Sequence, residues 1–246
     1  MTDTFFNQMT EELRELNIDL DSRQMEMFFS YYDMLVEKNK VMNLTAITEE
    51  SQVVSKHFVD SLSLVKAFSG SPFLPDRDIS LIDVGTGAGF PGIPLKIAFP
   101  EIRLTLLDSL NKRVRFLEDV CESLGLANVE CIHGRAEDGG RDKKLRESFD
   151  FCVSRAVANL ASLSEYCLPF VKIGGCFLSY KSGSIEEELQ AGNKAIAILG
   201  GKVEDVVSFS LPNFGMSRCL VKIRKIKPCP GKYPRKAGMP SKDPLC

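Results

Sequence analysis

Apolar positions in the first 70 residues recur at the spacing of helices. From Met25 onward they return along one helical face, at Phe28, Phe29, Tyr32, Leu35 and Val36. Asp21 or Ser22 is expected to cap this helix. A second stretch, from Glu50 to Phe68, repeats the spacing with Val54, Phe58, Leu62 and Val65. The pattern therefore predicts a helical cap over residues 1–70.

From Ile79 onward, short apolar runs alternate with amphipathic segments. The runs predict strands at Ser80–Val84, Arg103–Leu107, Val129–Ile132, Phe149–Ser154, Cys176–Lys181, Val203–Phe209 and Cys219–Ile223. The amphipathic segments predict helices at Ile93–Phe99, Lys112–Leu124, Leu160–Leu168 and Ile185–Leu199. This alternation, with continuously apolar strands, is typical of a buried, mainly parallel sheet that has helices on both faces.

The end of the chain departs from this alternation. The last two predicted strands follow one another without a helix, which indicates an antiparallel pair at one edge of the sheet. After Ile226, five prolines in 17 residues argue against regular structure. We therefore expect an α/β fold with a Rossmann-like, mainly parallel seven-stranded sheet over residues 71–226, followed by a tail over residues 227–246.

Composition excludes several classes of protein. No stretch approaches the roughly 20 uninterrupted apolar residues of a membrane span. Residues 1–20 lack the basic start and apolar run of a signal peptide. Six of the eight cysteines fall inside apolar segments and only two histidines are present, so we expect neither disulfides nor a metal site. These features predict a soluble, cytoplasmic protein with no membrane partner. We also expect a monomer, although the sequence does not establish the oligomeric state.

The net charge of −2 is unevenly distributed along the chain. Residues 221–246 carry eight Lys or Arg against one acid, which leaves the tail at +7 and the rest of the chain at −9. Such asymmetry indicates a basic arm that meets a polyanion. A solvated tail that only aids solubility explains the same charge equally well.

The sharpest motif is a strand that runs directly into glycines. Asp83 lies inside this strand and is followed by Gly85, Gly87 and Gly89, where the lack of side chains lets a ligand approach the backbone. About 20 residues on, Asp108 ends the next strand with a carboxylate that can accept both hydroxyls of a ribose.

Two ligands compete for this layout. Dinucleotides place a pyrophosphate over the glycine turn, whereas S-adenosylmethionine places its positively charged methionine end there. Asp83 would repel the first and attract the second. Gly87-x-Gly89-x-x-Gly92 nevertheless also satisfies the dinucleotide pattern, although Pro91 and Pro94 interrupt it. We therefore favour a class I S-adenosylmethionine methyltransferase and keep a nicotinamide-dependent oxidoreductase as the alternative.

With these residues in hand, the chain resembles the ribosomal small-subunit methyltransferase G family, also called glucose-inhibited division protein B. The matching segments span nearly the whole chain: Asn43–Thr45, His57–Ser61, Asp83–Leu95, Leu106–Ser109 with Lys112 and Arg113, Ser154–Ala156, Lys181–Gly183 and Tyr233–Gly238. Two departures are small. Ala88 and Phe90 stand where some members carry Pro and Leu, and Cys219 follows Arg218 where His is frequent.

The resemblance implies that S-adenosylmethionine is used to methylate N7 of a guanine in 16S rRNA, free or within the 30S subunit. By position, the family's cofactor contacts match Gly85, Phe90, Ala136, Glu137 and Arg155. In this fold the loop that holds Ala136 and Glu137 flanks the adenine. The predicted cofactor site thus consists of these five residues together with Asp83, Gly87, Gly89 and Asp108.

Guanine N7 has a lone pair and no proton, so its methylation needs no general base, and the task of the enzyme is to align the reactants. Arg155 and Lys181 lie at the ends of predicted strands and are expected to position the target, Lys181 by binding guanine O6 or phosphate. An ion pair with a carboxylate at the sheet end is the alternative for Arg155. His57 and Asp60 lie on one helix face, where a structural pair is the first interpretation and RNA contact by His57 the second.

The remaining expectations concern RNA. The predicted contacts are His57, Lys181, Arg218, Lys232, Arg235 and Lys236. Deletion of residues 228–246 is expected to weaken RNA binding and to spare cofactor affinity. A base must leave its helix to enter a buried pocket. A non-catalytic RNA-binding assembly factor on the same fold is the second alternative function.

Overall fold

The computed structural model describes residues 2–68, 78–155 and 158–245. Its sheet has seven strands in the order β3-β2-β1-β4-β5-β7-β6. The strands are β1 Ser80–Val84, β2 Arg103–Asp108, β3 Val129–His133, β4 Phe149–Arg155, β5 Val171–Ser182, β6 Gly201–Ser210 and β7 Ser217–Lys225. Strands β1 to β5 pair with one another in parallel, whereas β7 is antiparallel to both β5 and β6. The predicted α/β class and the antiparallel pair at the edge are confirmed.

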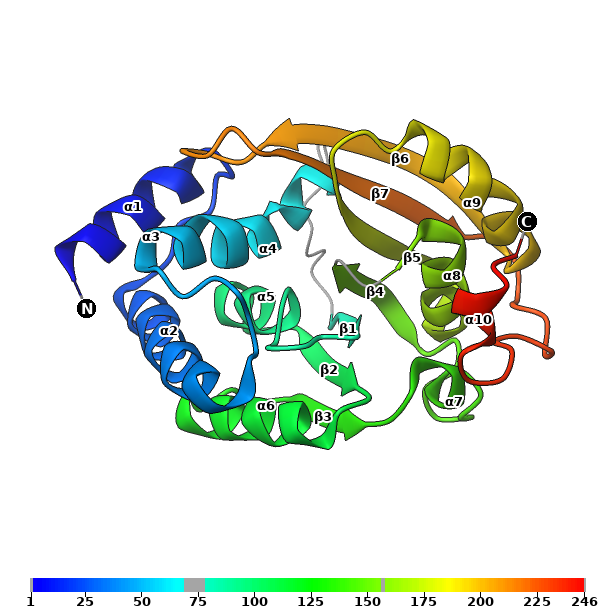
Figure 1. Ribbon diagram of the computed structural model, residues 1–246, viewed down its shortest axis with the longest axis horizontal. Helices are drawn as coiled ribbons and strands as arrows, with labels where there is room; N and C mark the ends of the chain where they lie inside the picture. Colours follow the sequence, from blue (N-terminus) through cyan, green and yellow to red (C-terminus); the bar gives the residue numbers. More distant parts are fainter. Residues whose placement is uncertain (1, 69–77, 156–157, 246) are drawn as a thin grey trace.

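Helices cover both faces of this sheet (Figure 1). One face packs against the N-terminal helices and against α5 and α6, and the other packs against α8 and α9. The longer helices are α1 Asp3–Arg14, α2 Ser22–Met42, α5 Gly92–Ala98, α6 Asn111–Ser123, α8 Leu160–Cys167 and α9 Glu186–Ile198. Short turns of helix are α7 Ala136–Gly139, η3 Leu168–Phe170 and α10 Met239–Lys242.

Strand β1 lies near the middle of the sheet, and all five of its residues are buried. Leu81 belongs to the core on the side of the N-terminal helices, whereas Ile82 and Val84 belong to the opposite core. This alternation follows from the two-residue period of a strand. The chain order reverses at β1, because β2 and β3 lie on one side and β4 on the other. Ligand sites of open α/β sheets form at the carboxyl ends of strands at such a point.

The N-terminal cap differs from the prediction in one segment. Asp21 caps α2 in a capping box, and Asn43 ends it with φ 49°. The segment predicted as one helix from Glu50 to Phe68 instead consists of α3 Glu50–Val53, the π-helix η1 Val54–Val59, α4 Asp60–Leu62 and the 3₁₀-helix η2 Ser63–Phe68. The wider π turn shifts the helical phase, so the polar residues Asp60 and Ser61 join Phe58 and Leu62 in the interior.

The C-terminal tail is folded onto the body of the protein, and α10 lies beside α8 (Figure 1). The prediction of no regular structure is therefore wrong at Met239–Lys242. Gly238 has φ 80°, which turns the chain, and Pro240 occupies the first turn of the helix, where its missing N–H costs nothing. Arg146 holds the segment before it by donating to the carbonyl oxygens of Cys229 and Tyr233.

Several expectations concern features that only part of the chain can address. The boundary expected between residues 70 and 71, and Ala156 in one matched segment, lie outside the described residues. The seven cysteines that the structure describes are free thiols. Among the described residues, no helix is long and apolar enough to cross a membrane, and no three His, Cys, Asp or Glu side chains group as metal ligands do.

Candidate active site

A cavity of about 430 Å³ opens at the carboxyl ends of β1, β2 and β4. This volume lies within the range of about 300–1,000 Å³ that is typical of small-molecule sites. Five of the nine residues predicted to bind a cofactor line it: Gly85, Asp108, Ala136, Glu137 and Arg155. Asp83, Gly87, Gly89 and Phe90 are not part of its lining. Three separate strand ends and the α7 turn thus converge on one cavity.

Gly87 and Gly89 shape the turn after β1. Both have positive φ angles, 63° and 104°, which other residues rarely adopt. A Cβ atom on Gly89 would also lie 2.6 Å from the hydroxyl oxygen of Tyr31. These two glycines therefore contribute the path of the backbone, while Gly85 alone of the three lines the cavity.

Asp108 connects the ends of β1 and β2. Its Oδ2 accepts a hydrogen bond from the Gly87 backbone N–H at 2.9 Å, and its Oδ1 accepts one from the Leu110 N–H at 2.9 Å. Arg113 lies 3.5 Å from the same carboxylate. The side chain is only 3% exposed, but it borders the cavity. A ligand hydroxyl that reaches Asp108 thus meets a charged acceptor whose orientation is already defined.

Asp83 lies beneath the glycine turn and is fully buried. Its Oδ2 accepts hydrogen bonds from Thr86 Oγ1 at 2.7 Å and from the Gly92 N–H at 2.8 Å. Its Oδ1 is buried and has no hydrogen-bond partner among the described residues. Burial raises the pKa of this carboxyl from 3.8 to about 7. Asp83 is therefore a buried acid that a nearby positive charge would ionise more fully.

Phe90 packs on the cap side of the turn. Its ring stacks on His57, with a centroid distance of 4.5 Å, and the guanidinium carbon of Arg155 lies 5.1 Å from its centroid. Tyr31 contacts it from α2. Phe90 thus lies between the sheet and the cap and is 6% exposed.

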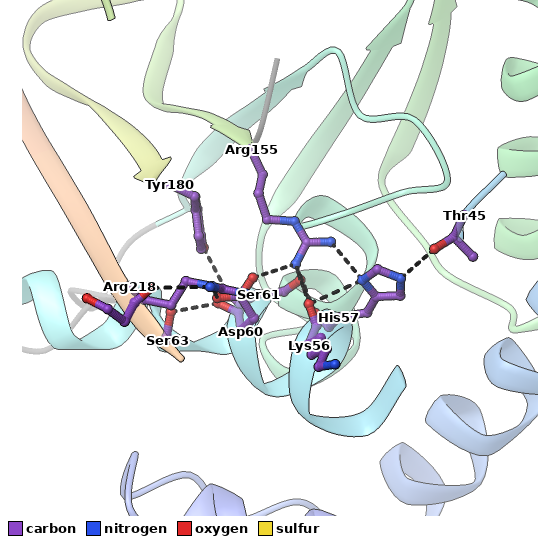
Figure 2. A network of polar contacts seen from close by, with 10 residues as sticks. Thr45, Lys56, His57, Asp60, Ser61, Ser63, Arg155, Tyr180 and Arg218 are labelled. Carbon is purple, nitrogen blue, oxygen red and sulfur yellow. Dashed lines mark hydrogen bonds and ion pairs between the residues drawn. The ribbon is translucent and has the colours of Figure 1, made fainter. Parts of the chain in front are cut away.

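Arg155 reaches from the end of β4 to the cap (Figure 2). Its Nη1 donates to Asp60 Oδ2 at 3.0 Å, and Arg218 Nε donates to the other oxygen of Asp60 at 3.0 Å. The alternative interpretation of Arg155 as an ion-paired residue is therefore correct, although the carboxylate comes from the cap. His57 and Asp60 were predicted to pair with each other. In the structure each of them contacts Arg155.

A second cavity of about 330 Å³ lies on the cap side of Arg155. It is lined by five residues singled out in the sequence: His57, Asp60, Arg155, Lys181 and Arg218. Because Arg155 borders both cavities, they adjoin at this side chain. With Lys56, which also lines it, four Lys or Arg side chains and the carboxylate of Asp60 therefore border a small space next to the first cavity.

The other polar groups of this second cavity are held in place. Lys181 Nζ donates to the Ala158 carbonyl oxygen at 2.7 Å and pairs with Glu188. Thr45 Oγ1 lies 2.8 Å from His57 Nε2. Burial, reinforced by the positive charge of Arg155, lowers the pKa of His57 to about 3. His57 is therefore a neutral ring at physiological pH.

The comparisons with known proteins agree with this geometry. A profile of the rRNA small subunit methyltransferase G family matches residues 24–218. The chain belongs to the rRNA small subunit methyltransferase G family. A relative of this name from Lachnoclostridium phytofermentans is 53% identical over 233 residues, which cover 95% of this chain and 94% of the relative. Another from Acetivibrio thermocellus is 50% identical and covers 93% and 91%.

Solved structures support the fold of this methyltransferase G family member. TrmN from Thermus thermophilus matches 68% of the chain and 48% of its own, with a TM-score of 0.50 and 13% identity. A variant of the 16S rRNA (adenine(1408)-N(1))-methyltransferase from Catenulisporales acidiphilia matches 62% and 87%, with a TM-score of 0.52 and 17% identity. The predicted class I methyltransferase fold is thereby confirmed.

Sequence reasoning missed part of the first cavity of this methyltransferase G family member. Tyr166 from α8 and Gly238 and Ser241 from the tail also line it. No local motif marks Tyr166, and Gly238 and Ser241 meet the strand ends only after the tail folds back. One signal was present: Glu165 is an acid inside the apolar stretch Leu160–Leu168, and it is fully buried. A buried carboxylate requires a partner.

That partner is Arg235, which was expected to contact RNA. Its guanidinium pairs with Glu165 and with Asp243. The structure thus places Arg235 in an intramolecular network, which argues against a role in phosphate binding. Lys222, Arg224 and Lys225 also have carboxylate partners, whereas Lys232 and Lys236 are exposed. Part of the basic charge of the tail is therefore paired within the chain, and contact of the tail with a polyanion stays a prediction for Lys232 and Lys236.

Proposed function

We propose that this protein transfers a methyl group from S-adenosylmethionine to N7 of a guanine in 16S rRNA. The observation that supports this most strongly is the pair of adjoining cavities that share Arg155. One borders the glycine turn and Asp108, and the other is lined by donors to a nucleobase. Membership of the rRNA small subunit methyltransferase G family supports the same assignment.

The first cavity fits S-adenosylmethionine by its size and by its charges. Asp108 is available to the ribose hydroxyls, and Ala136 and Glu137 border the same space. The orphaned Oδ1 of Asp83 is suited to a cationic ligand above the turn. A pyrophosphate over the glycine turn would lie near the Asp108 carboxylate and above the buried Asp83, which disfavours the nicotinamide alternative. When bound, S-adenosylmethionine supplies an electrophilic methyl group.

The second cavity fits the edge of a guanine. Guanine presents acceptors at O6 and N7, and Arg or Lys side chains are their usual partners. Arg155, Lys181 and Arg218 surround about 330 Å³ of space, and each has more N–H groups than its carboxylate partner uses. Since N7 carries no proton, no residue has to act as a base, and the neutral His57 serves as a flat wall. The contribution of these residues to the rate is orientation of the base.

We further propose that the acceptor is 16S rRNA, free or in the 30S subunit, and that the protein acts in the cytoplasm as a monomer. The target guanine must leave its stack to reach the second cavity. Of the predicted RNA contacts, Lys232 and Lys236 have exposed side chains. Lys181 and Arg218 line the cavity itself.

The test is transfer of labelled methyl from S-adenosylmethionine to 16S rRNA and to 30S subunits, followed by mapping of the modified base. A single N7-methylguanine is the expected product. Transfer to another atom or base would refute the assignment of the second cavity. Stronger binding of NAD(H) than of S-adenosylmethionine would instead favour the oxidoreductase, and cofactor binding without transfer to any RNA would favour a non-catalytic assembly factor.

A further inference from the structure

Glu165 anchors the C-terminal tail to helix α8. This carboxylate is fully buried, and it accepts four hydrogen bonds from a single residue of the tail. The Arg235 backbone N–H lies 2.7 Å from Oε1, and the guanidinium lies 3.0 Å from Oε1 through Nε and 2.9 Å from Oε2 through Nη2. Such a bidentate pair fixes both the position and the direction of the chain at Arg235.

Two further contacts hold the segment that follows Arg235. The Gly238 backbone N–H donates to Glu137 Oε1 at 2.8 Å, and Ser162 Oγ donates to the Pro240 carbonyl oxygen at 2.6 Å. Arg235 also donates to the backbone carbonyl oxygen of Asp243 at 2.6 Å, which joins the two ends of this segment. The segment from Arg235 to Asp243 is therefore fastened to both α7 and α8.

Between these contacts the tail borders the first cavity. Gly238 and Ser241 line it, together with Tyr166 of α8. Gly238 also binds the side chain of Glu137, which lines the cavity on that side together with Ala136. The tail thus lies at the α7 side of the cavity. The charged methionine end of S-adenosylmethionine is assigned to another part of the cavity, at Gly85 in the turn after β1.

We infer that residues 235–243 form a wall of the cofactor subsite that contacts the purine nucleoside end of the ligand. This rests on the proposed use of S-adenosylmethionine. Ser241 contributes a hydroxyl to this subsite and Tyr166 an aromatic ring. Glu165 and Arg235 act as positioning residues, because they place Gly238 and Ser241 without lining the cavity themselves.

The experiment compares full-length variants by calorimetry with S-adenosylmethionine, S-adenosylhomocysteine and adenosine. Ser241→Ala removes a hydroxyl and leaves the anchor intact, while Arg235→Ala removes the anchor. For Arg235→Ala we expect all three ligands to bind about tenfold more weakly, as loss of one well-placed polar contact predicts. For Ser241→Ala we expect a smaller loss of the same kind. Arg224→Ala is the matched control, because it removes an arginine that pairs with Glu204 at the sheet edge.

The ligands separate the possible outcomes. Equal loss for adenosine and for S-adenosylmethionine supports a nucleoside wall, whereas unchanged adenosine affinity in both variants overturns it. Thermal unfolding identifies a variant that loses affinity by unfolding, and Ser241→Ala then decides the question alone. If the wild-type protein binds none of the three ligands, the proposed function itself fails. Wild-type binding with unchanged variants refutes only the wall.

Discussion

Arg155 and Asp60 join the sheet to the N-terminal cap through an ion pair of 3.0 Å (Figure 2). Asp60 is 5% exposed and Arg155 13% exposed at the side chain, and Arg218 occupies the second carboxylate oxygen. A residue of the cap thus orients two arginines that belong to the ends of β4 and β7. The cap is therefore a component of the site, because it lines the second cavity with Ile47, Lys56, His57 and Asp60.

Replacement of Asp60 by Asn should destabilise the protein. Removing one partner of a buried ion pair leaves the other charges uncompensated, so we expect the free energy of unfolding to fall by about 3 kcal/mol. Denaturant unfolding measures this directly. Glu37→Gln is the control, because it breaks an exposed pair with Lys40 and should change stability little. Equal effects of the two variants would refute the role of Asp60.

Asp108→Ala should weaken binding of S-adenosylmethionine. The variant loses the acceptor for the ribose hydroxyls and the hydrogen bond that the Gly87 N–H donates to Asp108. We expect a loss of about 1–3 kcal/mol of binding free energy, as for hydrogen bonds to a charged group. Calorimetry measures it, with the exposed Asp119 of the same region, replaced by Ala, as the control. Unchanged affinity would remove Asp108 from the site.

Asp83 should make stability depend on pH. Its pKa in the folded protein is about 7, above the value of 3.8 for an unperturbed carboxyl. The folded state therefore binds the proton more tightly, and this contribution to stability is present at low pH and is lost as pH rises toward 7. Relative to Asp83→Asn, the free energy of unfolding of the wild type should decline across that interval and then level off.

His57 acts in the opposite direction in part of the same interval. Its pKa falls to about 3 from 6.5 on folding, so this residue makes stability rise with pH between those values. The effect is present in both the wild type and Asp83→Asn, so it cancels in the difference. Unfolding curves at successive pH values provide the measurement. A difference that does not vary with pH would show that Asp83 is ionised throughout.

The exposed lysines of the tail should affect RNA binding without affecting the cofactor. We expect the double variant Lys232→Glu, Lys236→Glu to weaken RNA binding and to reduce its dependence on salt. Cofactor affinity should stay unchanged, since neither residue lines the first cavity. Arg103→Glu with Lys144→Glu makes the same change of charge beside the amino ends of the strands. Equal RNA binding by both double variants would contradict the assignment.

Deletion of the tail should behave differently from these charge reversals. The sequence led to the expectation that removing residues 228–246 would spare the cofactor. The structure places Gly238 and Ser241 in the lining of the first cavity, so the deletion should weaken both cofactor and RNA binding. Titration of the truncated protein with S-adenosylmethionine provides the measurement. Wild-type affinity for the cofactor would restore the original expectation.

Much of the fold was predictable because the spacing of apolar residues along the chain indicates which side chains are buried. β1 was predicted with its observed bounds, Ser80–Val84, since a strand that is covered on both faces is continuously apolar. The glycine turn and Asp108 were recognisable because a tight turn and a strand end have local sequence signatures. The segment from Glu50 to Phe68 was mispredicted because its π turn and its buried Asp60 depend on partners from β4 and β7.

The sequence by itself determined the order of the strands along the chain, the family, and the acids that flank the glycine turn. These are properties of local spacing, which the chain carries before it folds. Only the tertiary structure decided that Arg155 pairs with Asp60 and that Arg235 pairs with Glu165, across separations of 95 and 70 residues. Which carboxylate neutralises a given arginine depends on where distant segments meet when the two cores are buried, and no local pattern specifies that meeting.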